Sequence, residues 1–174
     1  MKNLEKDKLE TLLTIIGSNP SLRLAHFCSD GEILVNMLHE YCYPKEYEYQ
    51  INCTNKSFYE ENVEKFKDFD TTLVRDFSLE RKSYMMQGKQ YDFVFVTTLI
   101  EEDFQEEFLK RVHRIILNAG NVLIFIPKGN YNERYKWVEL LEECNYVATS
   151  TIDDLFEHYD VIVSKKMHGW GSSV

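Results

Sequence analysis

Several kinds of segment are missing from this sequence, and each absence narrows the class of protein. No apolar run approaches the roughly 20 residues that a membrane-spanning helix needs. Residues 1–9 alternate charged side chains with leucine, and so do not provide the apolar centre of a signal peptide. No internal repeat, low-complexity tract or interdomain linker interrupts the chain. We therefore expect one cytoplasmic domain over residues 1–174, long enough to bury a substantial core, with a helix in residues 1–20 packed on the sheet.

Cysteine and histidine are too scattered to indicate a metal site. The four cysteines (Cys28, Cys42, Cys53 and Cys144) show no C-x-x-C spacing and lie in apolar stretches, where free thiols behave as small hydrophobic side chains. His39 and Cys42 lie three residues apart on a predicted helix, which is the only spacing that suggests a ligand pair. A zinc site needs a second pair, so we expect no metal.

Basic clusters are also scarce. The chain carries 20 lysine and arginine residues against 29 acidic residues, which gives a formal net charge of −9. Proteins that bind DNA or RNA usually present a basic face to the phosphates. The late pair Lys165–Lys166 is more simply interpreted as a solvated strand end. We therefore expect a small-molecule or protein partner rather than a nucleic acid.

Strand-like and helix-like segments alternate along the chain. Short apolar strands are predicted at 22–28, 47–53, 71–75, 92–98 and 122–126, and helices at 3–16, 102–118 and 133–144, with two further helices after residues 29 and 57. This alternation predicts a parallel sheet covered by helices on both faces. The last strands, 146–152 and 159–166, are joined by a turn too short for a crossover, so they must be antiparallel. The sequence predicts an α/β fold with a doubly wound, seven-stranded, mostly parallel sheet.

Capping residues predict where the helices begin and end. Gly17 is a plausible C-cap of the first helix, and Ser29 or Asp30 can cap the second. The tetrapeptide Ser-Phe-Tyr-Glu at 57–60 fits a capping box that opens the third helix.

The order of these elements resembles the class I S-adenosylmethionine-dependent methyltransferases over nearly the whole chain after residue 20. Residues 91–96 (YDFVFV) resemble the family's Phe-Asp-apolar run into the fourth strand, and residues 119–124 (AGNVLI) resemble its Pro-Gly-Gly-apolar start of the fifth. Residues 159–163 (YDVIV) resemble its last strand. The resemblance implies a Rossmann-like methyltransferase fold, with S-adenosylmethionine bound outside the carboxyl ends of the first strands.

The turn after the first strand departs from the family's glycine-rich pattern. It reads His-Phe-Cys-Ser-Asp-Gly at 26–31, with Gly31 as its one glycine and His26 where the family usually has an acid. A side chain at Cys28 or Ser29 occupies space that the cofactor needs near the backbone. Free N–H groups at the start of the next helix would still suit the cofactor's carboxylate. The alternative is that this turn only caps the helix.

The resemblance implies further cofactor contacts at the ends of the next strands. Asn52 stands where the family's acid holds the ribose hydroxyls, and its neutral amide forms weaker hydrogen bonds than a carboxylate. Its alternative is an Asx-type turn. Asp76 and Phe77 resemble the family's pair at the adenine, although a loop aspartate satisfied by a backbone N–H is an equal reading. Thr97, followed by Thr98, would face the bound methyl group.

No catalytic base can be assigned. Methyl transfer is an in-line displacement at a sulfonium, which depends largely on positioning the acceptor. Acidic residues at 101–103 are expected in a first helical turn because of the helix dipole. The Asn/Asp-Pro-Pro-aromatic signature of amino-group methyltransferases is absent from the sequence.

Two functions remain open. The first is an S-adenosylmethionine-dependent methyltransferase that acts on an unidentified small molecule or protein. The second is a degenerate protein of the same fold that lost tight cofactor binding and serves as a binding or interaction module. A different nucleotide-binding α/β protein is a third reading, and the missing glycine fingerprint counts against it. The tail at 168–171 (HGWG) is interpreted as a packing contact or a homodimer contact.

Overall fold

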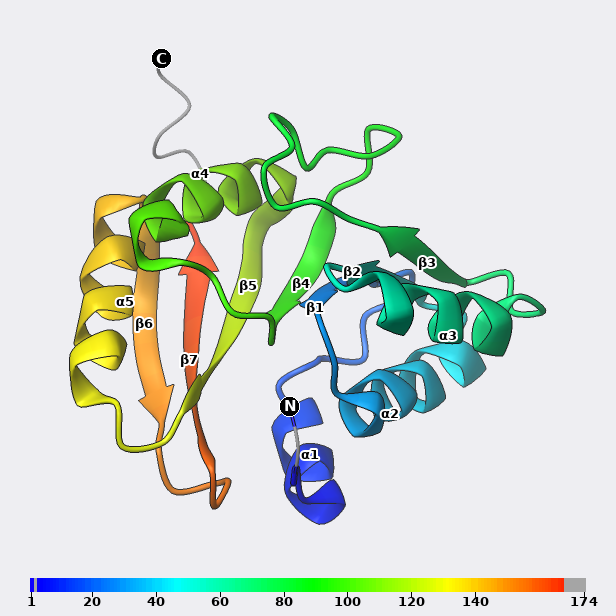
Figure 1. The fold of residues 1–174 in the computed structure, drawn as a ribbon, viewed down its shortest axis with the longest axis horizontal. Helices are drawn as coiled ribbons and strands as arrows, with labels where there is room; N and C mark the ends of the chain where they lie inside the picture. Colours follow the sequence, from blue (N-terminus) through cyan, green and yellow to red (C-terminus); the bar gives the residue numbers. More distant parts are fainter. Residues whose placement is uncertain (2, 168–174) are drawn as a thin grey trace.

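A seven-stranded sheet organises the chain (Figure 1). The computed structural model describes residues 1 and 3–167, so the predicted role of the tail at 168–171 lies outside the described residues. The strand order is β3-β2-β1-β4-β5-β7-β6, and β7 runs antiparallel to both of its neighbours. This confirms the doubly wound, mostly parallel sheet with an antiparallel final pair. The strands are β1 (Arg23–Cys28), β2 (Glu48–Cys53), β3 (Thr72–Asp76), β4 (Tyr91–Val96), β5 (Ile116–Pro127), β6 (Tyr146–Ile152) and β7 (Tyr159–Lys166).

Helices cover both faces of the sheet (Figure 1). They are α1 (Lys6–Leu13), α2 (Glu32–Cys42), η1 (Tyr43–Lys45), α3 (Lys56–Phe66), η2 (Glu102–Phe104), α4 (Gln105–Ile115) and α5 (Tyr131–Glu143). Buried side chains of α1, α2 and α3 share one hydrophobic cluster with β1 and β2, and those of α4 and α5 share a second cluster with β4 and β5. Among the described residues, no helix has the length and apolarity to cross a membrane.

The connection between β3 and β4 has an unusual form. All of residues 77–90 are described, and they contain no helix. The ring of Tyr84, 2% exposed, instead covers this part of the sheet face. Its centroid lies 5.1 Å from that of Phe77, 5.5 Å from Phe27 and 5.8 Å from Phe108. An aromatic cluster in an irregular segment therefore replaces the crossover helix that parallel strands usually require.

The boundary between α4 and β5 lies earlier than the sequence pattern predicts. The helix ends at Ile115 rather than near residue 118, because the backbone of Ile116 is extended (φ −84°, ψ 135°) and its side chain is fully buried. Strand β5 therefore begins at Ile116 rather than Val122. A Cβ at Gly120 would lie 2.7 Å from Ile116 Cγ2 and 2.8 Å from the carbonyl oxygen of Asp92. Glycine is required here by the close approach of β4.

The predicted caps are wrong at three helix ends. α1 ends at Leu13, and its C-cap is Thr14 rather than Gly17. Neither Ser29 nor Asp30 caps α2, because Gly31 is the N-cap, at a φ of +99° that suits glycine. α3 begins one residue before the predicted capping box. Its N-cap is Asn55, whose side chain accepts a hydrogen bond from the backbone N–H of Phe58 at 3.0 Å.

Candidate functional site

The carboxyl ends of β1, β4 and β5 enclose a cavity of about 240 Å³. The chain builds the sheet outward from β1 in one direction and from β4 in the other, so the cavity lies beside the switch point between them. Open α/β sheets bind ligands at such points. Its main lining comes from the loops after β1 and β4, from β5 and from α5: Ser29, Asp30, Thr97, Thr98, Leu99, Ile100, Ile124, Phe125, Pro127 and Trp137.

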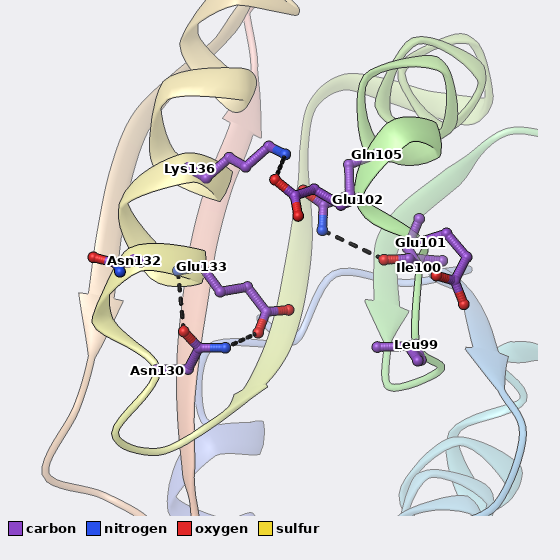
Figure 2. A pocket seen from close by; sticks show the side chains of 9 residues that line it. All are labelled: Leu99, Ile100, Glu101, Glu102, Gln105, Asn130, Asn132, Glu133 and Lys136. Atoms are coloured by element: carbon purple, nitrogen blue, oxygen red, sulfur yellow. Dashed lines mark hydrogen bonds and ion pairs between the residues drawn. The ribbon is translucent and has the colours of Figure 1, made fainter.

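A second cavity, of about 420 Å³, shares part of its lining with the first. Figure 2 shows the side chains that line it. It lies between the loop that follows β4 and the start of α5, and it shares Leu99, Ile100 and Glu133 with the first cavity. Its remaining lining is polar: Glu101, Glu102, Gln105, Asn130, Asn132 and Lys136. Because they share these residues, the two cavities are neighbours at the carboxyl edge of the sheet, and we treat them together as the candidate site.

The turn after β1 brings a helix N-terminus to this edge. Among the described residues, no side chain caps α2 at Gly31, so N–H groups of its first turn have no side-chain acceptor. Asp30 forms an ion pair with the amino group of Met1, which also lines the first cavity. The alternative prediction was that the Asp30–Gly31 turn caps the helix. Gly31 is indeed the N-cap, but the carboxylate of Asp30 forms no cap.

His26 lies beneath the cavity rather than in it. Its side chain is completely buried, with Nδ1 2.9 Å from the Tyr49 hydroxyl and Nε2 2.7 Å from the Thr97 hydroxyl. Burial lowers the pKa of this imidazole to about 3, so the ring is neutral at physiological pH, with one nitrogen donating and the other accepting. His26 therefore links β1 to β2 and holds the hydroxyl of Thr97, which does line the cavity.

Cys28 is likewise turned into the core. Its thiol is fully buried in the cluster under α1, α2 and α3, and lies 3.9 Å from the carbonyl oxygen of Asn52. The neighbouring Cys53 thiol, together with burial, raises the pKa of Cys28. Above the end of β1, the hydroxyls of Thr54 and Thr98 are hydrogen-bonded at 2.9 Å. The ends of β2 and β4 are thus connected across β1.

Asn52 belongs to a buried hydrogen-bond chain and not to an Asx-type turn. Its side chain is 1% exposed, and its oxygen accepts from Gln50 Nε2 at 2.8 Å. The oxygen of Gln50 in turn accepts from the hydroxyl of Tyr91 at 2.7 Å. The oxygen of Asn52 therefore already accepts one hydrogen bond, and the burial of its side chain limits the access of a ribose hydroxyl to the remaining lone pair.

Asp76 and Phe77 occupy different environments. The strand register places Asp76 beside Cys53, and Cys53 beside Cys28, in one row across three strands. Asp76 is exposed, whereas Phe77 is 3% exposed, with its ring centroid 5.2 Å from that of Phe27. The backbone N–H of Phe77 already donates to the carbonyl oxygen of Cys53 at 2.8 Å.

The structure therefore divides the predicted cofactor residues into three groups. Ser29 and Thr97 line the cavity, and Gly31 is the N-cap of the helix beside it. The buried members are His26, Cys28, Asn52 and Phe77, whereas Asp76 is exposed and lines neither of the two cavities. Sequence reasoning missed the contributions of Trp137, Glu133 and Gln105, because they come from α5 and α4, whose distance from the first strand gives no local signal.

Solved structures of methyltransferases match this arrangement. The CurJ carbon methyltransferase matches with a TM-score of 0.70 and 14% identity over 91% of this chain. A TehB-like S-adenosylmethionine-dependent methyltransferase from Corynebacterium glutamicum matches with a TM-score of 0.68 and 14% identity, over 94% of this chain and 89% of its own. An O-methyltransferase family protein from Burkholderia thailandensis matches with a TM-score of 0.70 and 8% identity, over 94% and 57% of the two chains. The chain has the class I methyltransferase fold.

These identities establish the fold alone, because one fold hosts many activities. The chain spans about half the length of two matched structures, 52% of CurJ and 50% of the citrinin polyketide synthase CMeT domain. No protein-family model matches the sequence, and no curated protein matches it significantly. The class I fold inferred from the order of strands and helices is confirmed.

Proposed function

We propose that this chain is an S-adenosylmethionine-dependent methyltransferase that acts on a small molecule or a protein. The observation that carries the proposal is the cavity at the switch point, which is lined by Ser29 and Thr97 and lies beside the start of α2, a helix that no described side chain caps. Ligand sites of this fold class lie at the same edge of the sheet. The matched structures with the same strand arrangement carry methyltransferase names, which supports the same reading.

The residues present suit one end of the cofactor better than the other. N–H groups in the first turn of α2 and the positive end of its dipole would hold the methionine carboxylate. Exposed Asp76 would accept a hydrogen bond from the adenine amino group or the ribose. The bound sulfonium would supply the methyl group, and its sulfur would keep the electron pair of the broken bond. Thr97 and Thr98 would orient the acceptor at the end of β4.

A specific set of contacts favours the second candidate, a binding module without tight cofactor binding. The hydrogen bond between Thr54 and Thr98 passes across the end of β1, and the side chain of Asn52 is buried. Both features restrict the access of the ribose half of the cofactor to the ends of β1 and β2.

Calorimetric titration with S-adenosylmethionine and with its demethylated product separates the two candidates. The methyltransferase proposal expects micromolar binding, roughly −8 kcal/mol, together with a change in the emission of Trp137, which lines the cavity. An absence of binding up to about 1 mM would favour the binding module.

Asp76→Ala tests the adenine end of this site. We expect it to weaken cofactor binding about tenfold, because a hydrogen bond to a charged group contributes about 1.5 kcal/mol or more. Asp70→Ala is the matched control, since Asp70 is an exposed acid just before the opposite end of β3. Equal affinity of both variants would remove Asp76 from the site.

A further inference from the structure

The larger cavity contains a buried acceptor without a donor. Gln105 begins α4 and is only 3% exposed. Its Nε2 donates to the carbonyl oxygen of Ile100 at 3.4 Å, which fixes the orientation of the amide. Its Oε1 is buried and has no hydrogen-bond partner among the described residues. Buried polar atoms in proteins are nearly always paired, and Gln105 is one of the residues that line the cavity, so a ligand with an N–H or O–H donor at this position would satisfy the oxygen.

The same cavity carries an excess of negative charge. Glu101, Glu102 and Glu133 line it, and the one ammonium, Lys136, forms an ion pair with Glu102. Figure 2 shows Glu102 and Lys136 directed toward each other across the cavity, with Glu133 on the same side of α5 as Lys136. One carboxylate oxygen of Glu133 accepts from Asn130 Nδ2 at 2.6 Å. The carboxylates of Glu101 and Glu133 therefore have no cationic partner within the part of the chain that the structure describes.

An organic cation satisfies this lining better than a metal ion. Among the described residues, no group of three or more histidine, cysteine, aspartate or glutamate side chains could hold a metal. Acceptors exceed free donors in the cavity, so a complementary ligand must bring both N–H groups and positive charge.

We propose that this cavity binds an alkylammonium or alkylguanidinium group, with Gln105 Oε1 and Glu133 accepting its N–H groups and Glu101 supplying further negative charge. The cavity adjoins the one lined by Thr97, so such a ligand would enter beside the proposed methyl donor. The cation site itself does not depend on the proposed function. Only the identification of its ligand as the methyl acceptor rests on that function.

Calorimetry with butylguanidine, butylamine and butylurea tests the proposal on the cofactor-free protein and again with S-adenosylmethionine. Butylurea has nearly the shape of butylguanidine but no charge. The two cations are expected to bind in the millimolar range or tighter, and butylurea at least about tenfold more weakly. Raised salt should weaken the binding of the cations and not that of butylurea.

Substitutions of the residues that line the cavity test where butylguanidine binds. Glu133→Gln and Gln105→Leu should each weaken butylguanidine binding by about tenfold, the effect expected for loss of one charge-assisted hydrogen bond. Glu142→Gln is the matched control, because Glu142 is exposed later on the same helix and does not line the cavity; its affinity should be unchanged. Glu133 is partly exposed, so its variant stays informative even if Gln105→Leu fails to fold.

Equal binding of butylurea, no effect of Glu133→Gln, or no cation binding up to about 10 mM would each overturn the proposal. Cation binding without cofactor binding would reject the methyltransferase function and keep the cation site. Cofactor binding without cation binding, in either set of titrations, would reject the cation site and keep the methyltransferase function.

Discussion

The side chain of His26 was predicted to contact the cofactor, but it lies under the cavity and is hydrogen-bonded to a residue that lines it. It is completely buried between the hydroxyls of Tyr49 and Thr97. A charged imidazole in this position would lose its hydration, and therefore burial lowers its pKa to about 3. The neutral ring connects residues of β1 and β2 with Thr97, which follows β4, and orients the Thr97 hydroxyl, which lines the cavity.

The buried histidine makes stability depend on pH in a definite direction. Between its folded pKa of about 3 and its ordinary value of 6.5, the unfolded chain binds a proton that the folded protein does not. The contribution of His26 is fully present above pH 6.5 and is lost progressively as pH falls toward 3. Moving from about pH 7.5 to about pH 5 should cost about 2 kcal/mol through this residue.

Urea denaturation of the wild type and of His26→Gln at both pH values measures this effect. Carboxylates titrate equally in the two proteins, so the difference between their pH dependences isolates the imidazole. We expect the variant to lose about 2 kcal/mol less than the wild type on acidification. Parallel losses would show that His26 is not held in its neutral form.

The segment between β3 and β4 is the element that departs most from a repeated strand–helix pattern. Residues 77–90 reach β4 without a helix, and Tyr84 anchors them by packing on Phe27, Phe77 and Phe108. Its hydroxyl also donates to the carbonyl oxygen of Leu79 at 2.6 Å. Phe77 was predicted to contact the cofactor together with its neighbour Asp76. Its packing in this cluster explains why Phe77 is buried, whereas Asp76 is exposed.

We therefore expect the side chain of Tyr84 to contribute strongly to the free energy of unfolding, although it lies in an irregular segment. Tyr84→Ala is expected to lower the free energy of unfolding by about 3–5 kcal/mol, the usual loss for a buried aromatic ring. Tyr84→Phe should lose only about 1 kcal/mol, the contribution of the hydroxyl. The control is Met85→Ala, since the adjacent Met85 is 37% exposed and should change stability by less than about 0.5 kcal/mol. Chemical denaturation followed by circular dichroism measures all three, and similar losses for Ala at both positions would contradict the anchor.

At the scale of the whole molecule, the two faces of the sheet form separate hydrophobic clusters around shared strands. Leu9 and Leu12 of α1 belong to the cluster that also contains α2 and α3, and Trp137 of α5 belongs to the opposite one. Because β1, β4 and β5 contribute side chains to both clusters, we expect the two faces to unfold together as one domain.

Leu12→Ala tests this coupling. The side chain of Leu12 is 2% exposed, so its truncation should cost about 2–5 kcal/mol. In a Trp170→Phe background, the emission of Trp137 and the far-ultraviolet circular dichroism should shift to the same lower denaturant midpoint, although Trp137 lies on the far face. Glu10→Ala, at an exposed position of α1, should leave the midpoint unchanged. A change in circular dichroism without a shift of the Trp137 transition would mean that α1 unfolds independently.

Strand and helix types were predictable because each leaves a local period in the chain. The apolar run in β4 predicts a central strand, and the short turn between β6 and β7 predicts their antiparallel pairing. Boundaries were less predictable. The start of β5 at Ile116 depends on burial against neighbouring elements, and the choice of Asn55 over Ser57 as a cap depends on where the chain leaves β2. Neither is encoded in a local pattern.

Hydrophobic periodicity and connection length are properties of contiguous residues, so the class of fold could be inferred from the chain alone. The set of side chains that reach the carboxyl edge of the sheet depends instead on long-range packing. The contact between Thr54 and Thr98, and the oxygen of Gln105 that finds no partner among the described residues, both depend on residues far apart in the chain, placed by strand register and helix packing. A buried position and a cavity-lining position can differ by one residue along a strand, because successive side chains point to opposite faces.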